Sequence, residues 1–192
     1  RPDRWHNKPT ALLGGISIYL ASFFAVLFLG LASKSVLPLF IGSAFLFIIG
    51  LLDDKFHFTP YAKLFTQIIA GCIAVSFGVV IGLPINFILA IPLTLLWIIG
   101  ITNSFNLLDN IDGLATGIAA ICSLMIFLSS LFIPNSPFGV FGLILSGAAL
   151  GFLPYNFNPA KIFMGDSGSM FLGYSLAIIS ISGAPSRIPN FL

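Results

Sequence analysis

Charged side chains are scarce in this sequence: they make up 7% of its 192 residues, whereas soluble proteins usually carry about 25%. Glutamate is missing altogether, so all six acidic residues are aspartates. Eight basic and six acidic residues cannot cover the surface of a soluble domain of 20.5 kDa. The scarcity excludes a cytosolic enzyme, a nucleic-acid-binding protein and a disordered segment, and a net charge of +2 gives no reason to expect a polyanionic partner.

Cysteine and histidine are also rare, with two residues of each type. Cys72 and Cys122 lie deep in separate apolar runs, which predicts packing residues and neither a disulfide nor a metal site. Because the sequence has no cluster of thiolates and no pair of neighbouring histidines, it also disfavours a zinc site.

Apolar residues, by contrast, make up 58% of the chain, and its mean hydropathy is +1.09. A helix needs about 20 apolar residues to cross the hydrocarbon core, or about 17 if it stands upright. The prediction is an all-α, polytopic integral membrane protein with about seven transmembrane helices. The seven windows lie at roughly 11–31, 36–52, 63–82, 84–101, 114–133, 138–154 and 168–184. Residues 1–192 form one membrane-embedded domain, interpreted as truncated at both ends because it starts at Arg1.

The polar residues gather on one side of these spans. Seven spans leave eight flanking segments, and four alternate ones carry six of the eight basic residues, all six aspartates and both histidines. These segments are 1–10, 53–63, 102–113 and 155–167. By the positive-inside rule they are cytoplasmic, so we expect a multi-pass protein of the cell membrane whose site faces the cytoplasm.

The first two of these segments combine basic and acidic residues at helix ends. His6 and Lys8 belong either to a basic stretch that attracts anionic lipid or to the lining of a phosphate site. Asp53 and Asp54 directly follow an apolar helix, where they oppose the helix dipole and repel each other, so they indicate a nearby cation. Because neighbouring helical residues point about 100° apart, we expect the two aspartates to have different roles. Lys63 enters the next span, with snorkelling as the alternative explanation.

The third segment repeats a polar residue at every third position: Asn103, Asn106, Asp109 and Asp112. At this spacing they form one stripe on a helix or a 3₁₀ turn. Helix capping explains one or two such residues but not four. Since polar groups at the edge of a bilayer are usually retained for a task, we favour a functional stripe.

The fourth segment places Asp166 between glycines directly before a helix. Asp166 or Ser167 is a plausible N-cap, but free amide groups at this helix end are equally a ready anion site. Nearby residues add a cation and a surface suited to a planar ligand: Lys161, Tyr155, Asn156 and Phe163.

Together the four segments offer hard oxygen ligands, lysines and amides at one membrane surface. Mg²⁺ is the cation that such ligands suit, because it binds through one or two carboxylates and completes its shell with water and substrate phosphates. The pattern therefore predicts phosphoryl chemistry on a nucleotide ester.

Four stretches resemble one family: RWHNKPTALLGG, the pair Asp53-Asp54, NSFNLLDNIDGLA and NPAKIFMGDSGSMFLG. The family is the polyprenyl-phosphate N-acetylhexosamine-1-phosphate transferases, integral membrane enzymes that start bacterial glycan synthesis. The resemblance covers residues 1 to about 180. The first stretch is similar to the branch that makes O-antigen, enterobacterial common antigen and teichoic acid linkers, whereas the related peptidoglycan branch usually has a different opening there.

The resemblance implies a Mg²⁺-dependent reaction, with Mn²⁺ as the alternative ion. A UDP-sugar and polyprenyl phosphate give polyprenyl-diphospho-sugar and UMP, with N-acetylglucosamine 1-phosphate as the expected group. The lipid phosphate is largely ionised at pH 7, so direct attack is favoured over a covalent aspartyl-phosphate. Phospho-MurNAc-pentapeptide transfer stays open, as does a homodimer; no nucleic acid is expected. A transporter is the alternative from another class, disfavoured because every aspartate lies at a span end on one face.

The resemblance also implies the roles of individual residues. Asp166 corresponds to the metal ligand of the family. The catalytic residues are Asp53, Asp54, Asp109 and Lys63. The substrate-binding residues are His6, Lys8, Asn103, Asn106, Asn110, Ile111, Asp112, Asn156, Lys161 and Phe163. The sequence departs from the family at Asn110, where a glycine is usual, and after Arg187, where no histidine-rich motif follows.

Overall fold

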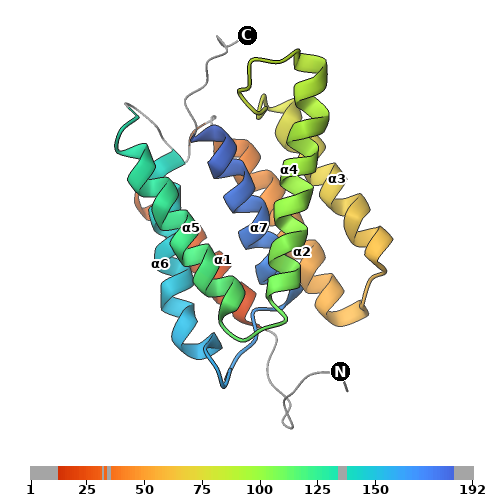
Figure 1. The fold of residues 1–192 in the computed structure, drawn as a ribbon. Helices are drawn as coiled ribbons and strands as arrows, with labels where there is room; N and C mark the ends of the chain where they lie inside the picture. The colour runs from red at the N-terminus through yellow and green to blue at the C-terminus, as the bar shows by residue number, and fades with distance from the viewer. Residues whose placement is uncertain (1–12, 32, 34–35, 134–137, 184–192) are drawn as a thin grey trace.

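The computed structural model describes residues 13–31, 33, 36–133 and 138–183. Within these ranges the chain folds into seven helices and no strand, which confirms the predicted all-α class (Figure 1). The helices are α1 (Gly14–Phe28), α2 (Leu37–Phe56), α3 (Pro60–Ser76), α4 (Phe87–Leu108), α5 (Leu114–Ser130), α6 (Phe138–Asn156) and α7 (Gly165–Ser182). Each predicted span overlaps one of them.

Three of the helices in the described part of the chain are long and apolar enough to cross a membrane: α2, α4 and α6. The helices α1 and α5 are also apolar but shorter. Large apolar side chains cover the outside of the bundle, for example Phe28 at 91% exposed and Ile88 at 74% exposed. Such a surface suits lipid as the surrounding solvent, in agreement with the predicted membrane protein. Cys72 and Cys122 are free thiols on this outer surface.

The boundary between α3 and α4 differs from the predicted spans, because residues 77–86 are not helical. Gly78 adopts a left-handed conformation with φ of 85°, which ends the helical path after α3. The amide of Ile81 then donates to the hydroxyl of Thr94 at 3.0 Å, so the segment folds back against α4. Asn86 caps α4 by accepting a hydrogen bond from the amide of Ile88 at 2.9 Å.

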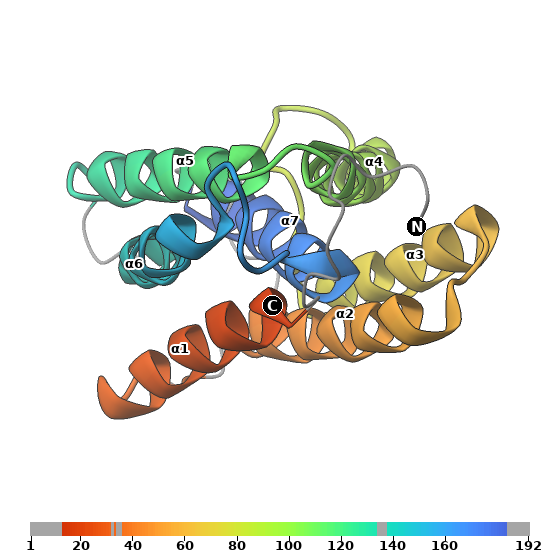
Figure 2. The same cartoon turned by 90° about the horizontal axis from the view of Figure 1, so that it is seen from below.

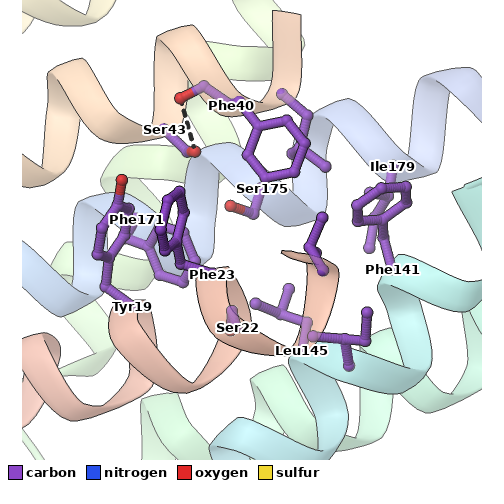
Figure 3. A pocket seen from close by; sticks show the side chains of 13 residues that line it. Tyr19, Ser22, Phe23, Phe40, Ser43, Phe141, Leu145, Phe171, Ser175 and Ile179 are labelled. Atoms are coloured by element: carbon purple, nitrogen blue, oxygen red, sulfur yellow. Dashed lines mark hydrogen bonds between the residues drawn. The ribbon is translucent and has the colours of Figure 1, made fainter. Parts of the chain in front are cut away.

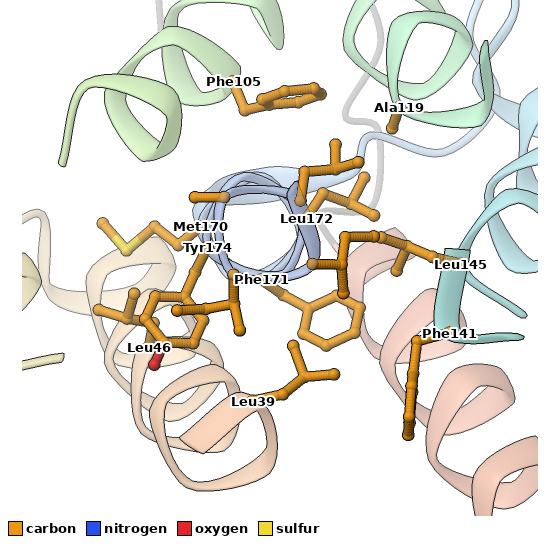
Figure 4. Close-up of a cluster of buried hydrophobic side chains, with 14 of the residues drawn as sticks. Leu39, Leu46, Phe105, Ala119, Phe141, Leu145, Met170, Phe171, Leu172 and Tyr174 are labelled. Atoms are coloured by element: carbon orange, nitrogen blue, oxygen red, sulfur yellow. The ribbon is translucent and has the colours of Figure 1, made fainter. Parts of the chain in front are cut away.

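The helix α7 runs through the middle of the bundle. Viewed along the bundle in Figure 2, α7 lies between the other helices, and its residues are buried almost throughout. Its apolar side chains pack against residues of α2, α4, α5 and α6 (Figure 4). Tyr174 is fully buried, and its hydroxyl donates to the carbonyl of Pro38 at 3.0 Å. The central helix is therefore held on all sides.

Two glycines allow α1 and α2 to approach the first turn of α7 closely. A Cβ atom added at Gly15 would lie 2.6 Å from Ser167 Oγ, and one added at Gly50 would lie 2.6 Å from Ser167 N. Any larger side chain at either position would push its helix away from α7. Small residues at such contacts are common where membrane helices pack closely.

A small cavity of about 40 Å³ lies between α1, α2, α6 and α7 (Figure 3). Its lining is mostly aromatic and aliphatic, and its hydroxyl-bearing residues are Tyr19, Ser22, Ser43 and Ser175. Among the described residues, the hydroxyls of Ser22 and Ser175 are buried without a hydrogen-bond partner.

Candidate active site

The ends of four helices bring charged and amide side chains together at the lower end of the bundle in Figure 1. At this end α2 and α4 finish, and α3 and α7 begin. Lys63 consequently lies 3.0 Å from Asp166, although 103 positions separate them in the sequence. We call the group formed by Asp53, Asp54, Lys63, Asn106 and Asp166 the Asp–Lys cluster.

Asp166 is the residue of this cluster that α3 and α4 both contact. One carboxylate oxygen, Oδ2, accepts a hydrogen bond from Lys63 Nζ at 3.0 Å, and the other, Oδ1, accepts one from Asn106 Nδ2. Asn106 Nδ2 also donates to the hydroxyl of Ser169 at 3.0 Å, one turn further along α7. The side chain of Asp166 remains 19% exposed. A ligand at the membrane surface therefore has access to a carboxylate whose orientation is fixed.

Asp53 is fully buried and pairs with the same lysine. Its Oδ2 forms an ion pair with Lys63 Nζ, and its Oδ1 accepts a hydrogen bond from the amide of Phe58 at 2.6 Å. The second contact exists because the chain reverses at His57, whose left-handed conformation (φ 55°) ends α2. The turn into α3 thus fixes Asp53, and Asp53 in turn fixes Lys63.

Asp54 makes different contacts from its neighbour, since adjacent helical residues point in different directions. Its carboxylate accepts hydrogen bonds from the amides of Asp166 at 2.8 Å and Ser167 at 3.2 Å. These are the first amides of α7, which lack partners within the helix. The sequence left open an N-cap by Asp166 or Ser167 and a free anion site. The structure shows neither, because Met164 precedes the helix without a side-chain cap and the Asp54 carboxylate binds the amides. The negative charge of Asp54 also lies at the positive end of the α7 dipole, which is a favourable interaction.

The charges of the Asp–Lys cluster do not balance. The cluster contains three carboxylates and one ammonium group, which leaves two formal negative charges in a largely buried site. Hard oxygen ligands with surplus negative charge are the environment that Mg²⁺ takes, with one or two carboxylates and the rest of its shell from water and phosphate. Among the described residues no group of three or more side chains is placed to hold a metal ion, so a cation here would take most of its ligands from water and substrate.

The four residues of the predicted polar stripe do not lie together in the structure, because three of them contact different parts of the protein. The helix α4 ends at Leu108, and Gly113, with φ of 72°, starts the turn into α5, so the four residues do not share one helical face. Asn103 contacts a glutamine of α3, and Asn106 contacts Asp166. Asp112 accepts hydrogen bonds from the loop before α7, namely from the amide of Ala160 at 3.0 Å.

A second polar group connects the loop between α6 and α7 to the start of α5. Besides Ala160, Asn158 Nδ2 donates to Asp112 at 3.3 Å. Asn156 is buried: its Oδ1 accepts from the hydroxyl of Thr116 at 2.7 Å, and its Nδ2 donates to the carbonyl of Ile162 at 3.1 Å. The oxygen and the nitrogen of the Asn156 side-chain amide are thus both paired, one with α5 and one with the loop.

The remaining predicted residues border this second group. Asn110 and Ile111 are exposed in the turn between α4 and α5, and Lys161 is exposed in the loop before α7. Phe163 is partly buried in the loop before α7. Asp109 directly follows the last residue of α4. Both residues interact with other parts of the protein. His6 and Lys8 lie outside the described residues. Of the predicted residues, the structure therefore brings Asp53, Asp54, Lys63 and Asn106 together with Asp166, while Asp112 and Asn156 bind the loop before α7.

Sequence reasoning missed two residues that contact the predicted ones. Ser169 lies within the quoted glycine-rich stretch but received no role, and it accepts a hydrogen bond from Asn106. Gln67 lies in the apolar run after Lys63 and was not considered. A lone amide side chain in a membrane helix is costly unless it is paired, and this rule alone would have pointed to Gln67.

Comparison with known proteins gives a family for this arrangement. The model of glycosyl transferase family 4 matches residues 36–184, which include the whole Asp–Lys cluster and the loop before α7. The match covers more than half of the chain.

Three relatives are similar over nearly the whole chain. A probable undecaprenyl-phosphate N-acetylglucosaminyl 1-phosphate transferase of Bacillus subtilis (strain 168) is 36% identical over 97% of this chain and 55% of its own length. A decaprenyl-phosphate N-acetylglucosaminephosphotransferase of Mycobacterium tuberculosis (strain ATCC 25618 / H37Rv) is 34% identical over 93% of this chain and 51% of its own. A phospho-N-acetylmuramoyl-pentapeptide-transferase of Staphylococcus aureus (strain Newman) is 36% identical over 92% of this chain and 64% of its own. The chain spans about half the length of the first two.

Proposed function

Because the chain belongs to glycosyl transferase family 4, we propose that it carries the membrane-embedded site of a sugar-1-phosphate transferase. The donor is a UDP-sugar, the acceptor is polyprenyl phosphate, and the products are polyprenyl-diphospho-sugar and UMP. The names of the Bacillus and Mycobacterium relatives support N-acetylglucosamine 1-phosphate as the transferred group. The Staphylococcus relative, which is equally similar, supports transfer of phospho-MurNAc-pentapeptide as the second candidate.

The observation that carries the proposal is the Asp–Lys cluster, in which one lysine is shared by two carboxylates. Sugar-phosphate transferases of this kind generally depend on a divalent metal, and we propose Mg²⁺ here. Asp166, whose carboxylate is partly exposed, would hold it. When bound, the ion neutralises negative charge on the diphosphate of the donor. Repulsion between the two anionic substrates is the main barrier to the reaction, and this neutralisation lowers it.

The residues of the chain then divide the remaining tasks. Lys63 supplies a positive charge beside the phosphate groups, in a position that Asp53 fixes. Asp54 holds the first turn of α7 and thereby the backbone that carries Asp166. Asn106 orients the Asp166 carboxylate from α4.

The hydrogen bonds of the adjacent aspartates support direct attack by the lipid phosphate. Each of the four carboxylate oxygens of Asp53 and Asp54 already has a donor: Phe58, Lys63, Asp166 and Ser167. A covalent aspartyl-phosphate would require one of these oxygens to leave its partner and attack phosphorus. The phosphate of the acceptor, ionised at neutral pH, needs no such activation.

We assign the uridine part of the donor to the group around Asp112. Asn110 and Ile111 are exposed there, and Lys161 and Phe163 border them across the loop before α7. Asn156 contributes by holding that loop, since the oxygen and the nitrogen of its side-chain amide are both bonded within the protein. His6, Lys8 and Asp109 complete the proposed site. The site faces the cytoplasm, following the distribution of basic residues.

The test is isotope exchange in the protein with its complete natural chain. Labelled UMP is expected to enter UDP-N-acetylglucosamine only when Mg²⁺ and polyprenyl phosphate are both present. Exchange without lipid, in a preparation free of endogenous polyprenyl phosphate, would reject direct attack but keep the transferase. The same exchange is measured with UDP-MurNAc-pentapeptide, and the donor that gains the label identifies the sugar that is transferred. An absence of exchange with either donor in folded protein would refute the proposed function.

A further inference from the structure

The peripheral helix α3 is attached to the bundle by a narrow face. Its buried residues are Gln67, Ala70, Gly71 and Ala74, so glutamine is the only large side chain among them. The opposite face is apolar and exposed, with Tyr61 at 83% and Phe65 at 64%. Small residues permit close contact between α3 and the bundle but do little to stop α3 from sliding along it. The lipid on the outer face does not hold α3 in place either. The position of α3, and with it that of Lys63, therefore depends on directional contacts.

Gln67 makes such a contact with α4. It is 1% exposed, and its amide pairs reciprocally with that of Asn103: Asn103 Nδ2 donates to Gln67 Oε1 at 2.6 Å, and Gln67 Nε2 donates to Asn103 Oδ1 at 3.3 Å. Asn103 Nδ2 also donates to the carbonyl of Ile99 at 2.9 Å, one turn earlier on α4. Two amides that satisfy each other in a low-dielectric interior fix the relative height of their helices.

The amide pair lies directly behind the two residues that hold Asp166. Gln67 follows Lys63 by four positions and Asn103 precedes Asn106 by three, so each pair shares a helix face. At a rise of about 1.5 Å per residue, the amides lie about 6 Å and about 4.5 Å deeper along the two helices. A shift of α3 past α4 at this level would move Lys63 relative to Asn106 by the same amount.

We propose that Gln67 and Asn103 are positioning residues that lock α3 to α4, so that Lys63 and Asn106 reach Asp166 together. Asn103 then acts through Gln67 and does not touch the substrate. The effect on turnover rests on the proposed function, whereas the effect on the contact between Lys63 and Asp166 does not.

The first experiment measures that contact without any activity. Lys63→Met is introduced into the wild type, into Gln67→Met and into Thr94→Val, and the melting temperature of each purified full-chain protein is compared with its own background. Thr94→Val is the matched control, because it removes a buried hydrogen bond of α4 far from the site. The change caused by Lys63→Met is expected to fall by at least half in Gln67→Met and to stay unchanged in Thr94→Val. An equal change in all three backgrounds would overturn the proposal.

The second experiment separates a positioning role from a purely structural one. Gln67→Met is expected to lower kcat by on the order of ten- to a hundredfold with little change in the KM for the UDP-sugar, because misplaced catalytic groups lose rate before they lose binding. Thr94→Val should keep wild-type kcat. The exchange Gln67→Asn with Asn103→Gln conserves both amides and the total side-chain length, and it should recover at least a third of the lost rate.

Two further outcomes are decisive. Should Gln67→Met not fold, Gln67→Met with Asn103→Leu replaces it, since that variant leaves no amide unpaired. Wild-type kcat in a folded Gln67→Met protein would overturn the proposal. If the wild type transfers no sugar phosphate, the proposed function fails, and the melting-temperature comparison still decides whether the amide pair positions Lys63.

Discussion

Asp54 and Asp166, which are joined by a hydrogen bond from the backbone amide of Asp166, are expected to respond in opposite ways to loss of their side-chain charge. Asp54→Asn and Asp166→Asn are matched changes, since each keeps the size of the side chain and removes one negative charge. The Asp54 carboxylate accepts hydrogen bonds from two amides in the first turn of α7, and no other partner of these amides is seen in the described structure. Asp166 instead adds a third carboxylate to a site with one ammonium group.

The magnitudes follow from these contacts. In Asp54→Asn the new amide turns a donor toward one of two N–H groups, so at least one charge-assisted hydrogen bond, of about 1.5–3 kcal/mol, is lost. The lost interaction with the α7 dipole adds about 0.3–1 kcal/mol. For a chain of this size, about 2–4 kcal/mol in the free energy of unfolding corresponds to a melting temperature lower by roughly 5–15 °C.

Asp166→Asn removes one attraction, two repulsions and one hydrogen bond, because the new amide turns a donor toward Lys63 or Asn106. At an effective dielectric constant of about 20, two unit charges about 4 Å apart interact by about 4 kcal/mol. The lost attraction to Lys63 is therefore offset by relief of the repulsion from Asp53 and Asp54, and Asp53 keeps its ion pair with Lys63. We expect a melting temperature within about 3 °C of the wild type, or above it, as is common for substitutions that relieve strained charge at an active site.

The assay is thermal unfolding of the purified proteins in detergent with EDTA, followed by the same measurement with Mg²⁺. Mg²⁺ should raise the melting temperature of the wild type and leave that of Asp166→Asn unchanged. Asp166→Asn should also lose transferase activity while it remains folded. The reasoning is refuted if Asp166→Asn without metal is less stable than Asp54→Asn, because the cluster would then need the Asp166 charge for folding.

Three further predictions test the fold around the site. In a cysteine-free background, Asn158→Cys should react with a membrane-impermeant thiol reagent from the cytoplasmic side and Leu83→Cys from the outside; labelling of both from one side would contradict the alternation of helices. Gly50→Ala should lower the melting temperature and the activity together, because its Cβ would meet Ser167. The control Gly147→Ala, whose Cβ would point into open space, should raise the free energy of unfolding by up to about 1 kcal/mol. Equal effects of the two variants would contradict the close contact of α2 with α7. Ser175→Ala should leave the melting temperature unchanged or higher, because the hydroxyl has no partner among the described residues, and a clear decrease would mean that the cavity satisfies it.

The helices were predictable because membrane length is a strong constraint. Seven apolar windows gave seven helices, and the alternation of sides placed all the aspartates at one end before any contact was known. The ends of the helices were less predictable, since they depend on local turns. Gly78 and the contact between Ile81 and Thr94 end α3 early, although the apolar run continues to residue 82.

The members of the site were predictable, but their partners were not. Asp53, Asp54, Lys63 and Asp166 all follow from polar residues at span ends, and the helical angle between neighbours separated the roles of Asp53 and Asp54. Nothing in the sequence says that Asp54 would bind the α7 amides, because that contact depends on how closely Gly50 lets α2 approach α7. Regular spacing was misleading for the stripe, since the helix that would align its members ends at Leu108.

The central position of α7 explains why residues from four helix ends can form one rigid site. Asp166 lies in the first turn of the helix that every neighbouring helix contacts, so each neighbour that reaches this turn adds a side chain in a fixed relation to the same backbone.

The arrangement also gives the site a net negative charge. Two surplus negative charges beside the backbone of Asp166 repel a bare nucleotide diphosphate, and the single lysine is already shared between two carboxylates. A diphosphate substrate is therefore expected to bind only together with a divalent cation, so a UDP-sugar should raise the melting temperature of the wild type with Mg²⁺ and not with EDTA. Stabilisation of equal size in EDTA would show that the lysine alone outweighs the three carboxylates.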